Sequence, residues 1–310
     1  MSDDSAAPLG AVLAAFAALY VIWGSTYLGI RFAIETMPPF TMAGVRFLCA
    51  GTLIYGWARA RGAGPGTRPQ WQTAAIVGAL LLLGGNGGVT WAEQRIPSGI
   101  AALLVASTPM WMVVLDALRP GGERPGPSVV AGLAVGVAGI VLLVGPSDLG
   151  GEPVDTVGAL AVAAAAFCWA VGSVYQRGAP KADSTLLNVG MQMLAGGTLL
   201  LLVGVGLGER LDVSAVSARS ALALAYLVLV GAIVGYSAYV WLLKVSSPAK
   251  VSTYAYVNPV VAVLLGWALA DEPMGPRVIA AGAAVVAAVA LITTARTAPA
   301  RPPSADGTVR

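Results

Sequence analysis

Ten apolar segments follow one another along the whole chain, separated by charged residues or by Pro/Gly turns. A transmembrane helix needs about 20 consecutive, mostly apolar residues, and each segment is long enough. The regular alternation of barrel strands is missing, so helices are expected, because lipid permits only helices or closed barrels. We therefore predict an all-α integral membrane protein with ten transmembrane helices. The segments fall at 9–30, 39–58, 71–91, 98–118, 127–145, 156–177, 184–207, 218–243, 248–270 and 275–295.

The composition excludes several other classes of protein. Hydrophobic residues make up 57% of the chain and charged residues 11%, against about 25% charged residues in a soluble domain. The absence of histidine removes the usual proton relay and metal ligand, and Cys49 and Cys168 lie in apolar runs as expected of buried small side chains. The net charge of +3 is too small to indicate nucleic acid. We expect a lipid bilayer as partner, with no cofactor and no metal.

The charges of the loops predict the orientation. The N-terminal stretch MSDDSAAPLG lacks the basic start of a cleavable signal peptide, so the first segment is interpreted as a retained span. If the N-terminal side is taken as the cytoplasm, twelve Lys and Arg residues lie on that side and five on the other. The positive-inside rule then places both termini in the cytoplasm of a bacterial inner membrane, including a disordered tail at 296–310.

Landmarks of the first half recur in the second half at a nearly constant offset. Trp23 and Arg31 recur 146 residues later as Trp169 and Arg177. Other matching landmarks are Gly51-Thr52-Leu53 with Gly197-Thr198-Leu199, Gly85 with Gly235, Pro109 with Pro259, and Glu123 with Glu272. The pattern predicts two five-helix units, 1–146 and 147–295. Since five is odd, the units are inverted relative to each other, as in many secondary transporters.

Several motifs carry a family resemblance over about residues 10–295. Ile22-Trp23-Gly24-Ser25-Thr26-Tyr27 is similar to the first-helix signature of the drug/metabolite transporter superfamily, EamA branch, and Val45-Arg46-Phe47-Leu48 resembles its second-helix arginine motif. The halves close with Thr108-Pro109 and Gly122-Glu123-Arg124, and with Asn258-Pro259 and Asp271-Glu272-Pro273. The resemblance implies two inverted five-helix units that export small organic molecules. It also implies a central cavity lined by the first, third and fourth helices of each unit.

Aromatic residues inside the spans are the first candidates for substrate binding. Tyr20, Trp23 and Tyr27 are spaced three and four apart, so they share one helical face. Trp23 and Tyr27 are predicted to line the cavity, as is Trp169, the counterpart of Trp23. The alternative is that such aromatics only mark the membrane interface.

A second candidate is Asn86, which lies among four glycines inside the third span. Glycine costs about 1 kcal/mol of helix stability relative to alanine, so the cluster indicates either close helix packing or a locally opened helix. The counterpart of Asn86 is Tyr236, which shares a helical face with Tyr239. Asn86 and Tyr236 are predicted to bind substrate.

Thr108 and Asn258 form a third pair, because each directly precedes a proline near the middle of its span. Proline leaves the carbonyl four residues earlier without its donor, here those of Val105 and Ala255, which become candidate ligands. Trp111 shares a face with Thr108, and Tyr254 shares one with Asn258, so these four are predicted to bind substrate. A kink that serves packing alone is the alternative.

The remaining charges admit structural explanations. Arg46 is expected to reach the membrane rim and pair with Glu35 or Glu93, although an intramembrane arginine is also a functional candidate. Glu123 and Glu272 are expected to stabilise the N-termini of the helices that follow them. Gly132, Gly136 and Gly139 are expected to pack closely on Ala280, Ala284 and Ala288.

The residues favour a secondary transporter for amino-acid-like or aromatic metabolites that works by alternating access. The alternative class is an integral membrane enzyme acting on a lipid or isoprenoid, which would need a carboxylate pair or histidine near a membrane interface. No such pair is found, and no phosphate-binding loop indicates direct use of ATP. No catalytic residue is predicted. Substrate, coupling ion, direction and oligomeric state are left open, and a monomer is compatible with the sequence.

Overall fold

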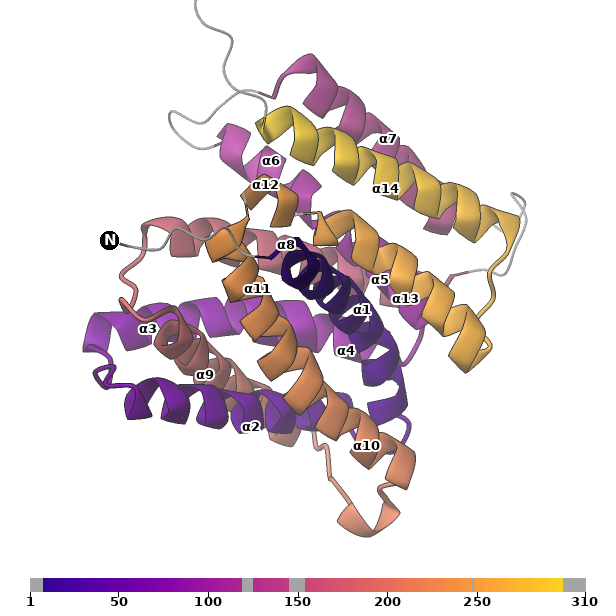
Figure 1. Cartoon of the computed structure of the whole chain (residues 1–310). Helices are drawn as coiled ribbons and strands as arrows, with labels where there is room; N and C mark the ends of the chain where they lie inside the picture. The colour runs from indigo at the N-terminus through magenta and orange to yellow at the C-terminus, as the bar shows by residue number, and fades with distance from the viewer. Residues whose placement is uncertain (1–7, 119–124, 145–153, 247, 252, 298–310) are drawn as a thin grey trace, which may run out of the picture.

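The computed structural model describes residues 8–118, 125–144, 154–246, 248–251 and 253–297. The helices of this part form ten rods, as predicted (Figure 1). The first five are α1 (Leu9–Ala33), α2 (Pro39–Ala60), α3–η1–α4 (Arg68–Val77, Gly78–Gly87, Gly88–Ala92), α5–α6 (Ser98–Val105, Thr108–Leu118) and α7 (Pro127–Val144). The last five are α8 (Thr156–Gly178), α9 (Thr185–Gly206), α10–η4–α11 (Ala218–Tyr226, Leu227–Val234, Gly235–Val245), α12–α13 (Pro248–Val251, Tyr254–Ala270) and α14 (Pro276–Thr297). A short 3₁₀ turn, η3 (Val213–Ala215), precedes α10.

The rods meet the requirements of a bilayer. Eight of them are long and apolar enough to cross a membrane, and α13 is a shorter apolar helix. Large apolar side chains such as Val141, Leu202 and Leu222 are exposed on their outer faces, which a soluble protein would avoid but lipid accommodates. Cys49 is also exposed, so the expectation that it is buried was wrong. Glu123 and residues 298–310 of the predicted tail lie outside the described residues.

Two antiparallel helix pairs join the two halves, α2 with α9 and α7 with α14 (Figure 1). In the second pair, a Cβ added to Gly139 would lie 3.0 Å from Ala284 Cβ, and one added to Gly136 would lie 3.1 Å from Ala288 Cβ. The predicted small-residue packing of these helices is therefore confirmed for Ala284 and Ala288. Because lipid provides no hydrophobic driving force between spans, such close approach supplies the dispersion energy that holds helices together.

A carboxylate stabilises the start of α5, although not the helix that the sequence suggested. Glu272 accepts hydrogen bonds from the backbone N–H groups of Ser98 at 2.7 Å and Gly99 at 3.0 Å. Its structural role was predicted correctly, but the helix belongs to the other half of the chain rather than being α14. The bonds satisfy donors that a helix N-terminus leaves unpaired and tie the loop after α13 to the start of α5.

Glu209 stabilises α2 in the same way from the loop after α9. Its carboxylate accepts from the backbone N–H groups of Phe40 at 3.1 Å and Thr41 at 2.7 Å, and from the Thr41 hydroxyl at 2.7 Å. The α2–α9 pair is thus fixed both by glycine contacts along its length and by a charged cap at one end.

The third span of each half contains a π-helical stretch, η1 in the first half and η4 in the second. The two stretches occupy equivalent positions in the repeat. A π-helix is wider than an α-helix and is often found at functional sites. The glycine cluster around Asn86 lies within and just after η1, and its glycines also approach α8 and α9 closely, so both interpretations of the cluster hold.

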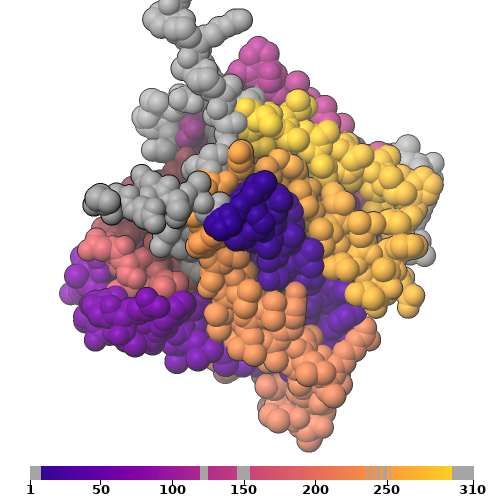
Figure 2. All heavy atoms as spheres, viewed as in Figure 1, coloured from indigo at the N-terminus to yellow at the C-terminus, as the bar shows by residue number. Residues whose placement is uncertain are grey.

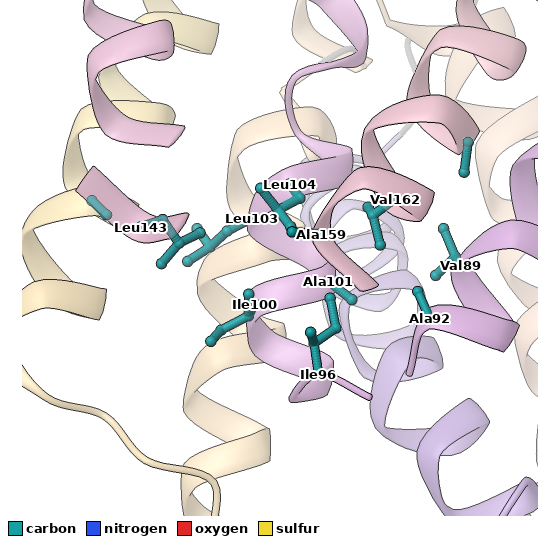
Figure 3. Packing of buried hydrophobic residues seen from close by; sticks show 12 residues of the cluster. Val89, Ala92, Ile96, Ile100, Ala101, Leu103, Leu104, Leu143, Ala159 and Val162 are labelled. Carbon is teal, nitrogen blue, oxygen red and sulfur yellow. The ribbon is translucent and has the colours of Figure 1, made fainter. Parts of the chain in front are cut away.

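The turn between α4 and α5 is buried at both of its ends. Ala92 and Ile96, at its two ends, are 0% and 2% exposed, and both belong to a core cluster that α4, α5 and α8 share (Figure 3). Val162 of α8 and Ala101 of α5 pack in the same cluster. Three residues separate Ala92 from Ile96 along the chain, and of these Glu93 is buried whereas Gln94 and Arg95 are exposed.

The α2–α9 crossing gives a test of the close packing. A Cβ on Gly190 would lie 2.8 Å from the Tyr55 backbone nitrogen, whereas Gly56 has open space around it. We expect Gly190→Ala to destabilise the protein by about 1–3 kcal/mol through overpacking. Gly56→Ala, the control on the same helix pair, should be neutral or stabilising by up to about 1 kcal/mol. Thermal unfolding in detergent measures both, and equal melting temperatures would contradict the packing.

Candidate functional site

Three aromatic side chains from three spans meet where the two halves come together. Trp23 of α1 lies 5.3 Å from the Tyr239 ring and 5.0 Å from the Tyr254 ring, centroid to centroid. Tyr239 and Tyr254 are themselves 6.0 Å apart in an edge-to-face arrangement. These distances are typical of favourable aromatic pairs. Trp23 and Tyr254 were predicted as site residues, while Tyr239 was noted only as a neighbour of Tyr236, whose side chain is outside the described part.

The repeat places an equivalent contact on the other side of the molecule. A Cβ on Gly235 would lie 2.6 Å from Trp23 Nε1, and one on Gly85 would lie 2.9 Å from Trp169 Cε3. The first span of each half therefore packs its tryptophan on a glycine of the third span of the other half. Both glycines lie at or next to the π-helical stretch of their span. Figure 2 shows α1, in indigo, packed against the orange segments of the second half.

Trp111 packs against α8, the helix that carries Trp169. Its ring lies 5.3 Å from the Phe167 ring in an edge-to-face arrangement, which connects α6 to α8 two residues before Trp169. Trp169 is 36% exposed, more than a closed binding site would allow. The predicted residues Trp111 and Trp169 thus lie near one helix pair, α6 and α8, while Trp23 and Tyr254 lie in the other aromatic group.

Two of the predicted polar residues serve their own helices. The Thr108 hydroxyl donates to the Val105 carbonyl at 2.6 Å, so that carbonyl already has one protein donor, and its role as a substrate ligand stays a prediction. The helix is interrupted here between α5 and α6, as expected before Pro109. The Asn86 amide donates to the Leu81 carbonyl at 3.4 Å, inside the π-helical stretch.

Asn258 differs from both. Pro259 lies within the continuous helix α13, and the Asn258 side chain is 8% exposed with no hydrogen-bond partner for its Oδ1. Its backbone carbonyl faces α1, because a Cβ on Gly24 would lie 3.1 Å from it. Asn258 is thus one turn from Tyr254 and beside the span that carries Trp23. It makes no hydrogen bond to Thr108, its counterpart in the repeat.

A charged group lies at the far end of α1, on the rim opposite the termini. Glu93 is 0% exposed, and neither of its carboxylate oxygens has a hydrogen-bond partner in the described part of the protein. Its backbone carbonyl accepts a hydrogen bond from Arg31 Nη1 at 2.7 Å. Tyr27, a predicted site residue, is electrostatically coupled to both Glu93 and Tyr254. Tyr27 therefore links the aromatic group to the charged one.

Arg46 is buried rather than extended to the rim. It is 7% exposed, and its Nε donor has no hydrogen-bond partner among the described residues. A Cβ on Gly231 would lie 3.9 Å from Arg46 Nη2, so the guanidinium lies against η4. The predicted pairing with Glu35 is wrong, because Glu35 forms its ion pair with Arg219 at 3.3 Å. Arg46 and Glu93 interact electrostatically without forming a direct ion pair.

The environment of Glu93 governs its protonation. Glu93 belongs to the turn that follows the span Arg68–Ala92, and its burial there raises the pKa of the carboxyl well above its usual range. The neighbouring Glu272 raises the pKa further, while Arg31 and Arg46 act in the opposite direction. Burial dominates because a carboxylate removed from water loses more hydration than distant cations restore.

Sequence reasoning named Glu93 only as an alternative rim partner of Arg46 and did not predict it as a buried site residue. A usable signal was the short turn between two apolar segments, which holds Glu93 between two buried ends. It also missed the bond between the Ser25 hydroxyl and the Tyr226 hydroxyl, 2.6 Å apart, which connects α1 to α10. No spacing in the sequence indicates that contact, because the two residues belong to different halves.

The comparisons with known proteins agree with this architecture. The EamA-like transporter family model matches residues 8–145 and 156–294. The chain is 42% identical to the "Uncharacterized inner membrane transporter YedA" of Escherichia coli (strain K12), over 89% of this chain and 88% of that protein. It is 28% identical to the "Probable amino-acid metabolite efflux pump" of the same organism, over 81% and 84%. A crystal structure with 26% identity superposes with a TM-score of 0.62, over 92% of this chain and 98% of the other.

The family match covers both halves of the chain, and the apolar helices fit a multi-pass protein of the bacterial inner membrane. The relatives are named as transporters, so the alternative of a membrane enzyme acting on lipid is set aside. With ten helices in two repeats and aromatic groups where those repeats meet, the chain belongs to the EamA-like transporter family and is a membrane transporter of that type.

Proposed function

We propose that this transporter exports small amino-acid-like or aromatic metabolites by alternating access between its two repeats. The observation that carries the proposal is the pair of equivalent contacts, Trp23 on Gly235 and Trp169 on Gly85. Two equivalent halves can exchange conformations, and such an exchange moves a central site from one side of the membrane to the other. The wider π-helical stretches beside both contacts are suitable places for the spans to adjust.

The substrate class follows from the side chains at the interface of the halves. Trp23, Tyr239 and Tyr254 offer ring faces and edges, and Asn258 adds an amide oxygen that has no hydrogen-bond partner among the described residues. Buried polar atoms cost free energy unless they are paired, so a ligand that donates to Asn258 Oδ1 would recover that cost. The name of the efflux-pump relative supports an amino-acid-like cargo.

The orientation of the chain in the membrane, with both termini in the cytoplasm, is part of the proposal. The predominance of Lys and Arg on one side favours cytoplasmic termini. We expect reporter fusions in the loop 62–66 and at the C-terminus to score as cytoplasmic, and a fusion in the loop 207–211 to score as external. A C-terminal fusion that reports the external side would contradict both the orientation and export through an inverted pair of repeats.

A second prediction concerns Asn258. If its amide binds substrate, Asn258→Ala loses an interaction of about 0.6–2 kcal/mol, which is about a three- to thirty-fold loss of affinity. Folding should be nearly unchanged, because no protein group depends on the side-chain oxygen and alanine suits a helix. Binding of L-phenylalanine and of the best amino acid found by counterflow in liposomes measures the affinity, and a thermal scan measures the stability.

Asn188 provides the matched control for this experiment. It is also 8% exposed with an unpartnered Oδ1, but it lies on α9, away from the aromatic group. Asn188→Ala should leave affinity unchanged. Equal affinities for the wild type and Asn258→Ala, together with a large loss of stability in Asn258→Ala, would place the amide in the fold instead of the site.

A further inference from the structure

Two opposite charges are buried near each other at the end of the candidate site and are not joined by an ion pair. Glu93 is 0% exposed with both oxygens unpartnered, and Arg46 is 7% exposed with its Nε unpartnered. The helix of Arg46, α2, packs against α4, which ends next to Glu93, and the two charges interact electrostatically. Removal of two charges from water costs several kcal/mol each, and direct contact is the usual compensation. The fold instead holds the charges apart, which leaves both available to a ligand placed between them.

The positions of the two side chains are fixed from different spans. Ala92 and Ile96 hold the turn of Glu93 in the core, and the Arg31 guanidinium binds its backbone carbonyl. The guanidinium carbon Cζ of Arg46 lies 4.9 Å from the centroid of the Phe47 ring, and the guanidinium also lies against η4. Glu93 belongs to the turn after the third span, and Arg46 belongs to the second span. A direct ion pair between them therefore needs a shift of one of these segments.

An opening and an apolar wall complete the arrangement. A hollow of about 290 Å³ on the rim is lined by Arg31, Ile34, Glu35 and Gln94, the residue next to Glu93. On the inner side, Tyr27 couples Glu93 to Tyr254, and Tyr254 packs on Trp23. Neither Glu93 nor Arg46 lines the hollow, so a ligand reaches them only when the rim opens at Gln94, and Tyr27 then lies on its inner side.

We propose that Glu93 and Arg46 form a subsite for zwitterions, in which Glu93 receives an α-ammonium group and Arg46 a carboxylate. The subsite selects free α-amino acids over compounds with one charge, while the side chain of the ligand points towards Trp23 and Tyr254. Arginine is suited to the carboxylate, because its planar group donates to two oxygens at once. This inference rests on the proposed function, since it names the charge class of that transporter's cargo.

Binding to the purified full-length protein in detergent tests the subsite with three probes. L-phenylalanine carries both charges, its methyl ester carries only the ammonium group, and N-acetyl-L-phenylalanine carries only the carboxylate. We expect the wild type to bind L-phenylalanine about ten-fold or more tightly than either derivative, from the strength of one charged hydrogen bond. A wild type without this preference overturns the subsite.

Variants assign each charge to one side chain. Arg46→Gln should abolish the preference over the methyl ester, and Glu93→Gln the preference over the N-acetyl compound. Arg46→Lys keeps the charge and should retain part of the preference. Arg95→Gln and Asp212→Asn, which change exposed charges on the same rim, should behave as the wild type. Full preference in Arg46→Gln or Glu93→Gln overturns the assignment.

The wild type alone gives a second readout if Glu93→Gln fails to fold. Because the pKa of Glu93 is raised, its carboxyl is protonated at low pH and becomes an acceptor for ammonium as the pH increases. Affinity for L-phenylalanine should therefore increase as the pH is raised above the usual carboxyl range, while that for N-acetyl-L-phenylalanine should not. Burial raises the pKa of Glu93 most, Glu272 raises it further, Arg31 and Arg46 lower it, and Tyr27 also interacts with the carboxyl. Equal pH dependence for the two probes overturns the role of Glu93.

Transport separates this inference from the proposed function. If liposomes show no counterflow of L-phenylalanine while binding depends on Glu93 and Arg46, the proposed export of such compounds fails and the subsite stands. If L-phenylalanine is transported and both variants keep the wild-type preference, the subsite fails and the proposed function stands.

Discussion

The absence of water from the hydrocarbon core is the constraint on which the rest of this structure depends. Each backbone N–H and C=O in a span must find a partner in the protein, and helix ends need partners near the membrane surface. Glu209 and Glu272 meet this need for α2 and α5 by accepting bonds from two backbone donors each. Inside the spans, Thr108 and Asn86 serve carbonyls of their own helices. Asn258, Glu93 and Arg46 keep buried polar atoms without a partner among the described residues, and these atoms are the candidates for contact with a ligand.

Those unpartnered atoms are distributed in a way that packing does not explain. Asn258 Oδ1 lies beside the aromatic group, Glu93 lies next to Gln94 of the rim hollow, and the Nε of Arg46 lies within the second span. Tyr27 lies between them in electrostatic terms. Both structural carboxylates, Glu209 and Glu272, accept hydrogen bonds from backbone N–H groups, so the fold is able to provide partners for acidic side chains. That it leaves Glu93 unpaired is consistent with a ligand as the missing partner.

The sequence predicted the ten helices well, because each span must be apolar over a fixed length and loops must carry charge. The predicted boundaries agree with the helices to within a few residues, from α2 at Pro39–Ala60 to α8 at Thr156–Gly178. The site was harder to predict. Trp23 and Tyr254 do meet, but Tyr239 and the burial of Glu93 depend on contacts between spans of different halves, and no local pattern encodes those. Glu272 shows the same limit: its role as a cap was evident, while the helix that it caps was not.

The position of Arg46 connects the charged group to the conformational change that transport needs. Its guanidinium lies against η4, the π-helical stretch of the eighth span. In the same span η4 is followed by α11, whose first residue, Gly235, packs against Trp23. A shift of η4 relative to α2 would change the space open to the Arg46 guanidinium and with it the distance to Glu93, which a different turn holds. A bound zwitterion that bridges the two charges favours the arrangement in which both contacts are made. A ligand shifts a conformational equilibrium only through such differential contacts, so the residues that recognise the charges would also couple recognition to movement of the repeats.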